Sequence, residues 1–334
     1  MLRLPYKVRL KSGKARVYKK ADYKVINWSS YNKSLKKRGA LSLYFPKGDL
    51  QALFINSQSY IEGLSGRAAH YRPIYIELIY MFYRLFNWGL RQMTGYFEDL
   101  WQNKGLAISV PSFGHLSDLF ASLSLEVKHY CQKVVDKLKD GEDVTLIVDS
   151  TGMSFSRASD WYEEKYNKPC KNRPWRKLHL AIDPDMNMHR VELTDHVTDD
   201  LVMLKPLMPD HLGIDKVIAD GAYYSIENGQ TLSKQGIIPV IPPPKNAIVH
   251  GQENTTWHDK IVTYIKEKAT VYAFHKKYGY GLRSLVEAQI SRIKRCIGST
   301  LLTRKIESQK NEAVIIANII NIWNSFGKPK NVKA

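Results

Sequence analysis

Two aspartates follow segments that have the composition of buried strands. Asp149 comes directly after the apolar run 144–148, and Asp220 comes directly after 216–219. The carboxyl ends of strands are where open α/β sheets place their ligands. The small residues that follow each aspartate would let a substrate backbone approach. Either aspartate taken alone could instead be a helix cap or a turn residue.

A third carboxylate lies in a helical pattern. Arg283, Glu287 and Lys294 are separated by four and seven residues. At about 100° per residue this spacing places them within roughly 60° of arc on one helix face, and Tyr280 joins the same stripe. A solvated face with an Arg283–Glu287 pair, worth about 0.2–0.5 kcal/mol, would have the same spacing. The convergence of a carboxylate, two cations and a tyrosine favours a functional face.

Together, Asp149, Asp220 and Glu287 would form a site of oxygen ligands. Carboxylates suit hard ions such as Mg²⁺ or Mn²⁺. Two such ions about 3.5–4 Å apart clamp the attacking and leaving oxygens of an in-line displacement at phosphorus. The three carboxylates therefore predict metal-dependent cleavage or transfer of a phosphodiester.

Positive charge is concentrated at the two ends of the chain. The net charge is +18, from 50 Lys and Arg against 32 Asp and Glu. Residues 1–40 carry +12 and residues 292–334 carry +7, whereas the rest of the chain sums to −1. Basic segments of this kind neutralise phosphates along an extended track, so nucleic acid is the predicted partner. Solvating tails or a patch for an anionic membrane are the alternatives. Aromatic residues interleaved with the lysines favour nucleic acid, namely Tyr6, Tyr18, Tyr23, Trp28 and Tyr31.

Length and composition indicate a folded protein of the reducing cytosol. The 334 residues, 44% hydrophobic and 25% charged, suffice for about two domains. The three cysteines fit neither a disulfide framework nor a paired-cysteine zinc site. The most apolar stretch, 74–90, contains Glu77 and Arg84, and the chain begins with charge rather than with an apolar run. We expect no membrane span and no secretion.

Helical patterns dominate the first half of the chain. We expect a basic arm over 1–40 and a helical region over 41–140 of the kind that contains helix-turn-helix DNA readers. Pro73 and Ser112 are suited to helix starts. The predicted elements are a helix from Tyr31 to Gly39 with a strand-like run to Phe45, and helices over 73–103, 113–123 and 125–138.

From residue 144 onward, strands and helices alternate. The predicted strands are 144–148, a hairpin of 178–182 and 188–193, 216–219 and 237–241, and the predicted helices are 198–208, 225–234, 280–296 and 312–325. Such a pattern indicates an α/β fold whose mixed layer has three central strands, two of them hairpin partners. The predicted catalytic domain spans 141–325 with a polar, irregular insertion at 245–279, and a basic tail follows at 326–334.

Three motifs resemble those of one protein family. The segment after residue 279 reads Tyr280-x2-Arg283-x3-Glu287-x6-Lys294, which is similar to the Tyr-Arg-Glu-Lys signature of DDE transposases from bacterial insertion sequences. Asp149-Ser-Thr-Gly and Ala219-Asp220-Gly-Ala-Tyr resemble the two aspartate motifs of the same proteins. The three acids follow in the family's order, 71 and 67 residues apart. Further segments, 31–39, 175–183 and 236–247, are similar to the insertion-sequence-five group, so that the resemblance covers roughly residues 28–325.

The resemblance implies an RNase H-like mixed-sheet catalytic core preceded by a helical DNA-binding domain that recognises the terminal inverted repeats of the element. It implies action as a homodimer or higher multimer on paired ends of double-stranded DNA, in the bacterial cytoplasm at the nucleoid. Two divalent ions, Mg²⁺ or Mn²⁺, would be held by Asp149, Asp220 and Glu287. DNA near the cut would be contacted by Tyr280, Arg283 and Lys294.

A few other residues are weaker candidates for DNA contacts. Arg173, Arg176 and Lys177 precede the second strand and could follow the DNA, although solvated charge explains them equally well. Lys245 lies in a basic loop where relatives carry arginine after the isoleucine-proline strand, whereas Pro244 stands at that place here. Trp257 and His258 could stack on a displaced base. His179, inside an apolar strand pattern, is predicted to be a core histidine rather than a ligand.

The predicted reaction has two steps in one site. Water attacks the phosphodiester at the element's end and frees a 3′-hydroxyl, which then attacks target DNA without a covalent protein intermediate. Catalysis would rest on positioning and on electrostatic stabilisation at phosphorus. One alternative is another nuclease of this fold, such as a junction-resolving or repair enzyme. A DNA-binding regulator with a vestigial catalytic core is the other, and the intact carboxylates argue against it.

Overall fold

The computed structural model describes residues 22–56, 70–155, 165–167, 174–209 and 212–333. The chain divides into two compact units, a smaller one comprising Met1–Leu41 and Phe326–Ala334 and a larger one comprising Ser42–Ser325. Tyr6, Tyr18 and Arg173, which are candidate nucleic-acid contacts, lie outside the described residues.

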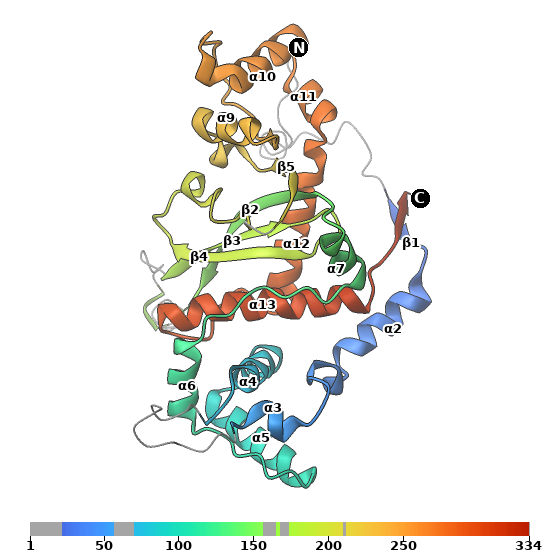
Figure 1. Cartoon of the computed structure of the whole chain (residues 1–334), viewed down its shortest axis with the longest axis vertical. Helices are drawn as coiled ribbons and strands as arrows, with labels where there is room; N and C mark the ends of the chain where they lie inside the picture. The colour runs from blue at the N-terminus through green and yellow to red at the C-terminus, as the bar shows by residue number, and fades with distance from the viewer. Residues whose placement is uncertain (1–21, 57–69, 156–164, 168–173, 210–211, 334) are drawn as a thin grey trace. The chain divides into compact units, whose positions relative to one another are not determined.

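The larger unit is built on a five-stranded mixed sheet (Figure 1). Its strands are β2 (Val144–Ser154), β3 (Trp175–Ile182), β4 (Met188–Asp195), β5 (Ile214–Ile218) and β6 (Ile238–Val240). The order across the sheet is β4-β3-β2-β5-β6, with β3 antiparallel to both neighbours and β5 and β6 parallel to β2. The predicted hairpin and the five predicted strands are confirmed. The three central strands are β3, β2 and β5, so only one of the two hairpin partners is central, because β4 lies at the edge. This mixed sheet fits an RNase H-like core.

Helices and short 3-10 turns accompany the sheet. In chain order they are η2 (Asp200–Met203), η3 (Gly221–Tyr223), α9 (Ile226–Lys234), η4 (Glu253–Thr255), α10 (Thr256–Glu267), α11 (Val271–Tyr278), η5 (Tyr280–Arg283), α12 (Ser284–Cys296) and α13 (Ile306–Phe326). Helix α9 confirms the helix predicted over 225–234, and Ser225 caps it by accepting a hydrogen bond from the Asn228 amide at 3.2 Å.

Two predictions for this region are wrong. No full helix forms over 198–208, where the apolar spacing belongs to the short turn η2 and to Leu204 and Leu207, which are buried against the sheet. The segment 245–279 is not irregular, because α10 and α11 occupy most of it. Ile261 of α10 and Phe274 of α11 are buried, so each helix has an apolar side that stabilises it.

The two faces of the sheet have different neighbours. Side chains alternate between the faces along a strand. Leu146 and Val148 of β2 join the hydrophobic core that contains Tyr223 and Leu232. The side chain of Asp149 therefore points to the opposite face, on which α12 packs against β2 and β3.

A helical region precedes the sheet along the chain. It consists of η1 (Leu41–Tyr44), α3 (Leu50–Phe54), α4 (Pro73–Phe86), α5 (Leu90–Asn103), α6 (Phe113–Ser122) and α7 (Gln132–Lys139). Pro73 begins α4 and Ser112 caps α6, as predicted. The single helix predicted over 73–103 is two helices, because Asn87 adopts a left-handed φ of 55° and ends α4. The strand-like run after Gly39 is also not a strand, since it forms the 3-10 helix η1.

Aromatic side chains fill the core of the helical region. The rings of Phe54 and Tyr75 stack with centroids 4.7 Å apart, and those of Phe82 and Phe97 stack at 5.6 Å. The Trp101 indole donates a hydrogen bond to the Tyr75 hydroxyl at 2.8 Å. All five residues are fully buried, so the packing of large rings holds α3, α4 and α5 together.

Helix α13 carries buried asparagines that hold an extended segment of the chain. The Asn318 side chain accepts a hydrogen bond from the Lys128 amide at 2.8 Å and donates one to the Glu126 carbonyl at 3.2 Å. Asn321 donates to the Lys128 carbonyl at 2.9 Å. The helix predicted over 125–138 therefore begins only at Gln132, because α13 satisfies backbone groups that a helix would otherwise pair internally.

A buried ion pair joins α13 to α4. Arg84 and Glu312 are 1% and 0% exposed, and the Arg84 Nη1 donates to the Glu312 Oε1 at 2.7 Å. The same guanidinium nitrogen donates to the Thr300 carbonyl at 2.8 Å. Glu312 also accepts from the amides of Leu302 and Thr303 at 2.8 and 2.9 Å. This network fixes the loop between α12 and α13 against the helical region.

The described part of the smaller unit comprises β1 (Tyr23–Val25), α2 (Trp28–Arg38) and β7 (Asn331–Lys333). Strands β1 and β7 pair antiparallel, with Tyr23 opposite Lys333 (Figure 1). The helix predicted from Tyr31 to Gly39 is confirmed, and it begins three residues earlier, at Trp28. The smaller unit thus combines residues from both ends of the chain.

None of the helices in the described residues is both long enough and apolar enough to span a membrane.

The Arg84–Glu312 pair yields a prediction about stability. We expect Arg84→Met to lower the free energy of unfolding by about 3–5 kcal/mol, because it leaves the Glu312 carboxylate buried without its cation. Urea denaturation measures this change. The exposed pair Arg190–Glu192 provides a matched control, since Arg190→Met should cost only about 0–1 kcal/mol. Equal decreases in the free energy of unfolding of the two variants would show that the buried ion pair stabilises the protein no more than the exposed one.

Candidate active site

Asp149 lies at the point along β2 where this strand is no longer paired with β5 and remains paired only with β3. The pairing of β2 with β5 ends at Ile147 opposite Ile218, whereas its pairing with β3 continues to Ser154. The strand therefore does not end at Asp149, as the sequence predicted, but runs five residues further. The half-buried Asp149 side chain lies just beyond the end of β5. Its Oδ1 accepts a hydrogen bond from the Ser150 amide at 2.8 Å, and its Oδ2 accepts one from Arg283 at 3.0 Å.

Asp220 follows β5 at the same edge of the sheet. Strands β2, β5 and β6 are parallel neighbours, so their carboxyl ends lie side by side. The Asp220 side chain caps η3 by accepting a hydrogen bond from the Ala222 amide at 2.9 Å. The cap interpretation of this residue is confirmed. The residue also lies at the edge where ligands bind in such sheets, and its role as a ligand stays a prediction.

Glu287 reaches this edge from α12. The predicted single helix from Tyr280 is divided, since Tyr280 and Arg283 lie in the 3-10 turn η5 and the α-helix begins at Ser284. Arg283 pairs with Glu287 one turn later, as the alternative interpretation of a solvated helix face expected. The same guanidinium pairs with Asp149, so Arg283 bridges the carboxylates of β2 and α12.

The charges of Asp220 and Glu287 contribute to the electrostatics of Asp149. Burial raises the pKa of Asp149, and the negative charges of Asp220 and Glu287 raise it further, while the Ser150 amide and Arg283 act in the opposite direction. Burial likewise raises the pKa of Tyr280; the Arg283 charge opposes this, and the three carboxylates add to it. Negative charge is thus concentrated at one partly desolvated place, where a cation is favoured.

The donor set fits a hard divalent cation. Three carboxylates offer oxygen ligands of the kind that Mg²⁺ and Mn²⁺ prefer. Among the residues that the structure describes, no three His, Cys, Asp or Glu side chains already form a cluster that could hold a metal ion. Arg283 binds two of the three carboxylates, and their rearrangement around an ion would require this guanidinium to move.

The structure gives the predicted DNA-contacting residues different surroundings. Lys294 lies half-buried on α12, and Lys245 is exposed in the loop that follows β6. The Arg176 side chain donates to Gln309 at 3.2 Å and lies 4.9 Å from the ring centre of Phe155. Lys245 therefore follows the carboxyl end of β6, and Lys294 lies two turns beyond Glu287 on α12, whereas Arg176 makes contacts inside the protein.

Lys177 belongs to a polar network behind Asp149. Its Nζ donates to the Thr198 carbonyl at 2.7 Å and lies 3.6 Å from the Asp200 carboxylate. His179 is fully buried, as predicted for a core histidine, and its Nε2 pairs with the Thr194 hydroxyl at 2.9 Å. The network occupies the face of the sheet opposite to that of Asp149.

Sequence reasoning missed Tyr223 as part of this network. Its hydroxyl lies 3.5 Å from the His179 Nδ1. Burial raises the pKa of Tyr223, and a hydrogen bond with the Ser150 side chain opposes that effect. Because Ser150 follows Asp149 and pairs across the sheet with His179, the network supports the strand that holds the first carboxylate. The signal in the sequence was the tyrosine three residues after Asp220.

The predicted base-stacking pair Trp257–His258 is engaged within the protein. His258 is buried, and it bonds to the Tyr224 hydroxyl and to the Ile248 carbonyl at 2.8 Å. The Trp257 ring lies edge-on to Tyr278 of α11 with centroids 5.8 Å apart. Near the carboxylates, the Tyr280 ring instead stacks on His275 at 4.3 Å. The contacts of Trp257 and His258 thus join α10 to its neighbours.

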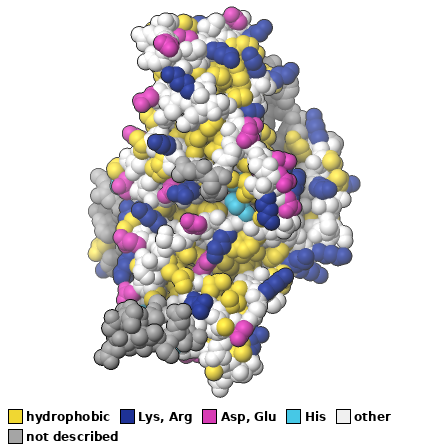
Figure 2. Space-filling model, viewed as in Figure 1, with side chains coloured by type: hydrophobic (Ala, Val, Ile, Leu, Met, Phe, Trp, Pro, Cys, Tyr) yellow, Lys and Arg dark blue, Asp and Glu magenta, His cyan; other side chains and the backbone are white. Residues whose placement is uncertain are grey.

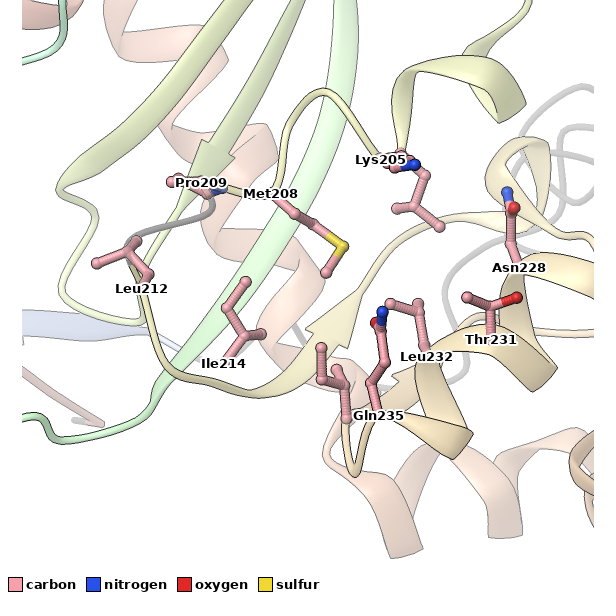
Figure 3. Close-up of a pocket in the computed structure, with 11 residues that line it drawn as sticks. Lys205, Met208, Pro209, Leu212, Ile214, Asn228, Thr231, Leu232 and Gln235 are labelled. Carbon is pink, nitrogen blue, oxygen red and sulfur yellow. The ribbon is translucent and has the colours of Figure 1, made fainter.

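The larger unit also contains an apolar cavity of about 290 Å³ (Figure 3). It lies between the segment leading into β5 and helix α9, with Met208 and Ile214 on one side and Leu232 on the other. Lys205, Asn228 and Gln235 supply polar groups to its lining. The residues that line it do not include the three carboxylates, so the cavity is separate from the candidate active site.

Comparison with known families agrees with this geometry. Residues 140–322, more than half of the chain, match a family model described as a transposase DDE domain, and residues 36–158 match a second model of the same description. These matches define the class of the protein as nucleotidyl-transfer enzymes. The chain belongs to the transposases with a DDE domain.

The buried His179 yields a prediction about pH. Burial lowers its pKa to about 4, whereas the unfolded chain titrates near ~6.5. Below that value the unfolded state binds the proton more readily than the native state, so this group destabilises the protein as the pH falls from ~6.5 toward 4. We expect His179→Asn to flatten that loss of stability, measured by urea denaturation across the window.

The exposed His196, which directly follows β4, supplies the control. His196→Asn should keep the wild-type dependence of stability on pH. If His179→Asn also kept it in full, the burial of His179 would not be the cause.

Proposed function

We propose that this transposase binds the terminal inverted repeats of its own insertion sequence, cleaves the DNA at the ends of the element and transfers them into target DNA. We also infer that the element belongs to the insertion-sequence-five group. Support for the group comes from the Tyr-Arg-Glu-Lys motif and from the segments 31–39, 175–183 and 236–247.

One observation carries the proposal. Asp149, Asp220 and Glu287 come from three separate elements of a domain that matches transposase DDE domains, and their charges act on one another at the carboxyl edge of the sheet. Unrelated structural carboxylates would not be expected to converge at the place where such sheets bind substrates. We therefore assign them as the catalytic acids.

Asp149, Asp220 and Glu287 would together hold two divalent cations, Mg²⁺ or Mn²⁺. Such ions supply Lewis-acid stabilisation of the charge that develops at phosphorus. The chain itself supplies the geometry, since β2 and β5 fix the two aspartates and α12 positions Glu287. Ser150 and Ala222 donate backbone amides to the aspartates, which keeps each carboxylate in one orientation.

The reaction consists of two displacements at phosphorus. Water attacks the phosphodiester at the element's end, the bond to the 3′-oxygen breaks, and a 3′-hydroxyl and a 5′-phosphate result. The 3′-hydroxyl then attacks a phosphodiester of the target, and the target's own 3′-oxygen leaves. Catalysis comes from positioning and from charges prearranged around phosphorus.

We assign Arg283, Tyr280 and Lys294 to the DNA near the cut. Arg283 holds Asp149 and Glu287 in the absence of DNA, and a phosphate would offer the same bidentate partner to its guanidinium. Lys294 lies on the same helix as Glu287, two turns further along. The helical region over 41–140 would recognise the inverted repeats, and the protein would act as a homodimer or higher multimer on paired ends.

The catalytic assignment is tested by neutral substitutions. We expect Asp149→Asn, Asp220→Asn and Glu287→Gln each to abolish cleavage of a labelled duplex that carries the gene's own flanks in Mg²⁺ or Mn²⁺. Binding of the same duplex should remain, because ligands of the metal do not contribute the main affinity for phosphates. Near-wild-type cleavage by one variant would remove that residue from the site.

Two exposed carboxylates of the larger unit provide matched controls. Asp215→Asn changes an exposed carboxylate of β5, and Glu227→Gln changes one on α9, so both should cleave like the wild type. If the wild type binds the flanks specifically but cuts under neither metal, even with paired ends supplied, a regulatory protein with a vestigial core becomes the better interpretation.

Lys294 yields a prediction about salt dependence. We expect Lys294→Ala to weaken binding of the cleaved end and to reduce the slope of log affinity against log salt by about 0.9, the contribution of one phosphate contact. Fluorescence anisotropy at several salt concentrations measures the slope. Lys234→Ala, on the exposed side of α9, should leave it unchanged, and an unchanged slope for Lys294→Ala would indicate a scaffolding role.

A further inference from the structure

The smaller unit carries most of the net charge of the protein. Its sequence, Met1–Leu41 with Phe326–Ala334, contains 16 Lys and Arg and a single acidic residue, Asp22. Its net charge is therefore +15 out of +18, and Ser42–Ser325 retains only +3. The basic N-terminal segment and the last nine residues of the C-terminal basic segment thus belong to one compact unit, whereas 292–325, with a net charge of +4, belongs to the larger unit.

Backbone pairing joins the two ends. Strand β1 pairs antiparallel with β7 over three residues, from Tyr23 opposite Lys333 to Val25 opposite Asn331. The Ile26 amide extends the ladder by donating to the Lys330 carbonyl at 2.9 Å. The C-terminal tail is thus a structural part of the unit that the N-terminal segment forms.

Asn27 strengthens this connection at the start of α2. Its Nδ2 donates to the Lys328 carbonyl at 3.0 Å, and its Oδ1 accepts from the Lys330 amide at 2.7 Å. Asn27 stands at the N-cap position, yet its side chain makes no capping bond, because both of its polar atoms bind the tail. An uncharged side chain therefore fixes the backbone of a basic segment.

Gly327 allows the tail to approach α2 closely. Its φ is +130°, a conformation that favours glycine, and a Cβ at this position would lie 3.3 Å from the Cβ of Ser34. Ser34 is only 1% exposed. The tail thus leaves α13 along a path that is closely packed against the second turn of α2.

The paired ends present cations and aromatic rings to solvent. The exposed lysines of the described part of the unit are Lys24, Lys33, Lys36, Lys37, Lys330 and Lys333. In Figure 2, Lys and Arg side chains gather over α2 and over the β1–β7 pair at the right of the view. Tyr23 and Trp28 are 68% and 54% exposed among them. Lysines around exposed rings are typical of surfaces that bind nucleic acid.

We propose that both ends of the chain together form one module that binds the phosphate backbone of double-stranded DNA, and that the C-terminal tail is required for it. This inference rests on the proposed function in one respect, namely that the bound DNA is the substrate of transposition. An anionic membrane fits less well, because α2 has few apolar residues and no continuous apolar face of the kind that enters a bilayer.

The module should supply affinity rather than specificity. Lysines that contact phosphates add the same free energy on any sequence, whereas base edges must be read by other groups. Loss of tail contacts should therefore weaken binding to the element's end and to a scrambled duplex by the same factor. The ratio of the two affinities should stay constant.

The test compares three variants of the full chain by fluorescence anisotropy on both duplexes at several salt concentrations. Lys330→Gln with Lys333→Gln removes two exposed cations of the tail, and we expect the log–log salt slope to fall by up to about 1.8, two phosphate contacts at about 0.9 each.

Asn27→Ala removes no charge but releases the tail backbone, and we expect it to weaken binding about tenfold, a factor that corresponds to ~1.4 kcal/mol. Lys139→Gln with Lys234→Gln, both exposed and in the larger unit, is the charge-matched control and should bind like the wild type.

The outcomes separate this inference from the proposed function. One outcome is that the wild-type protein binds and cleaves DNA, while both tail variants keep its DNA affinity and its salt slope. This result would overturn the module and leave the transposase assignment intact. A loss confined to the element's end would also overturn it, because the tail would then read sequence. A tail effect seen only on vesicles rich in phosphatidylserine, and not on DNA, would assign the module to membranes. Absence of wild-type binding to either duplex would contradict the proposed function itself.

Discussion

The burial of polar groups on α13 is the constraint on which the larger unit depends. This helix is buried on nearly all sides, and its Glu312 and asparagines have to be satisfied by other parts of the chain. Arg84 satisfies Glu312, and the extended segment 123–131 and the β3–β4 hairpin satisfy Asn318 and Asn321. Displacement of any partner would leave a buried polar group without a hydrogen bond, which costs free energy. These bonds therefore fix the position of the helical region on the five-stranded sheet.

The candidate active site follows from the alternation of side chains along β2. Asp149 faces α12 and the bridging Arg283, whereas the next residue, Ser150, faces Tyr223 and the buried His179. One strand therefore separates a polar network that supports the site from the carboxylates that would perform the chemistry. The pairing of β5 with β2 ends before Asp149, so this partly buried carboxylate stands beside the carboxyl end of β5.

Local patterns in the sequence predicted what local physics determines. Ser112 and Ser225 marked helix starts, the turn after Ile182 marked the hairpin, and the spacing of Arg283 and Glu287 predicted their pair. The extended segment 123–131 was missed because its hydrogen-bond partners are asparagines about 190 residues away in the chain. That Asp149, Asp220 and Glu287 form one site stays a prediction, made from strand ends, helix spacing and motif order. The Arg283 bridge and the Tyr223 network depend on three-dimensional packing that no local pattern encodes.

The distribution of charge between the two units explains how a site made of carboxylates can act on a polyanion. The larger unit has a net charge of only +3 and concentrates negative charge around Asp149, so on its own it would attract DNA weakly. The smaller unit, with +15, provides the long-range attraction. Affinity and chemistry are then supplied by separate parts of the chain. Because attraction to phosphates is independent of sequence, the proposed module leaves the choice of the cleavage position to the larger unit. There, on the proposed function, Arg283 would exchange its carboxylate partners for a phosphate of the bound DNA.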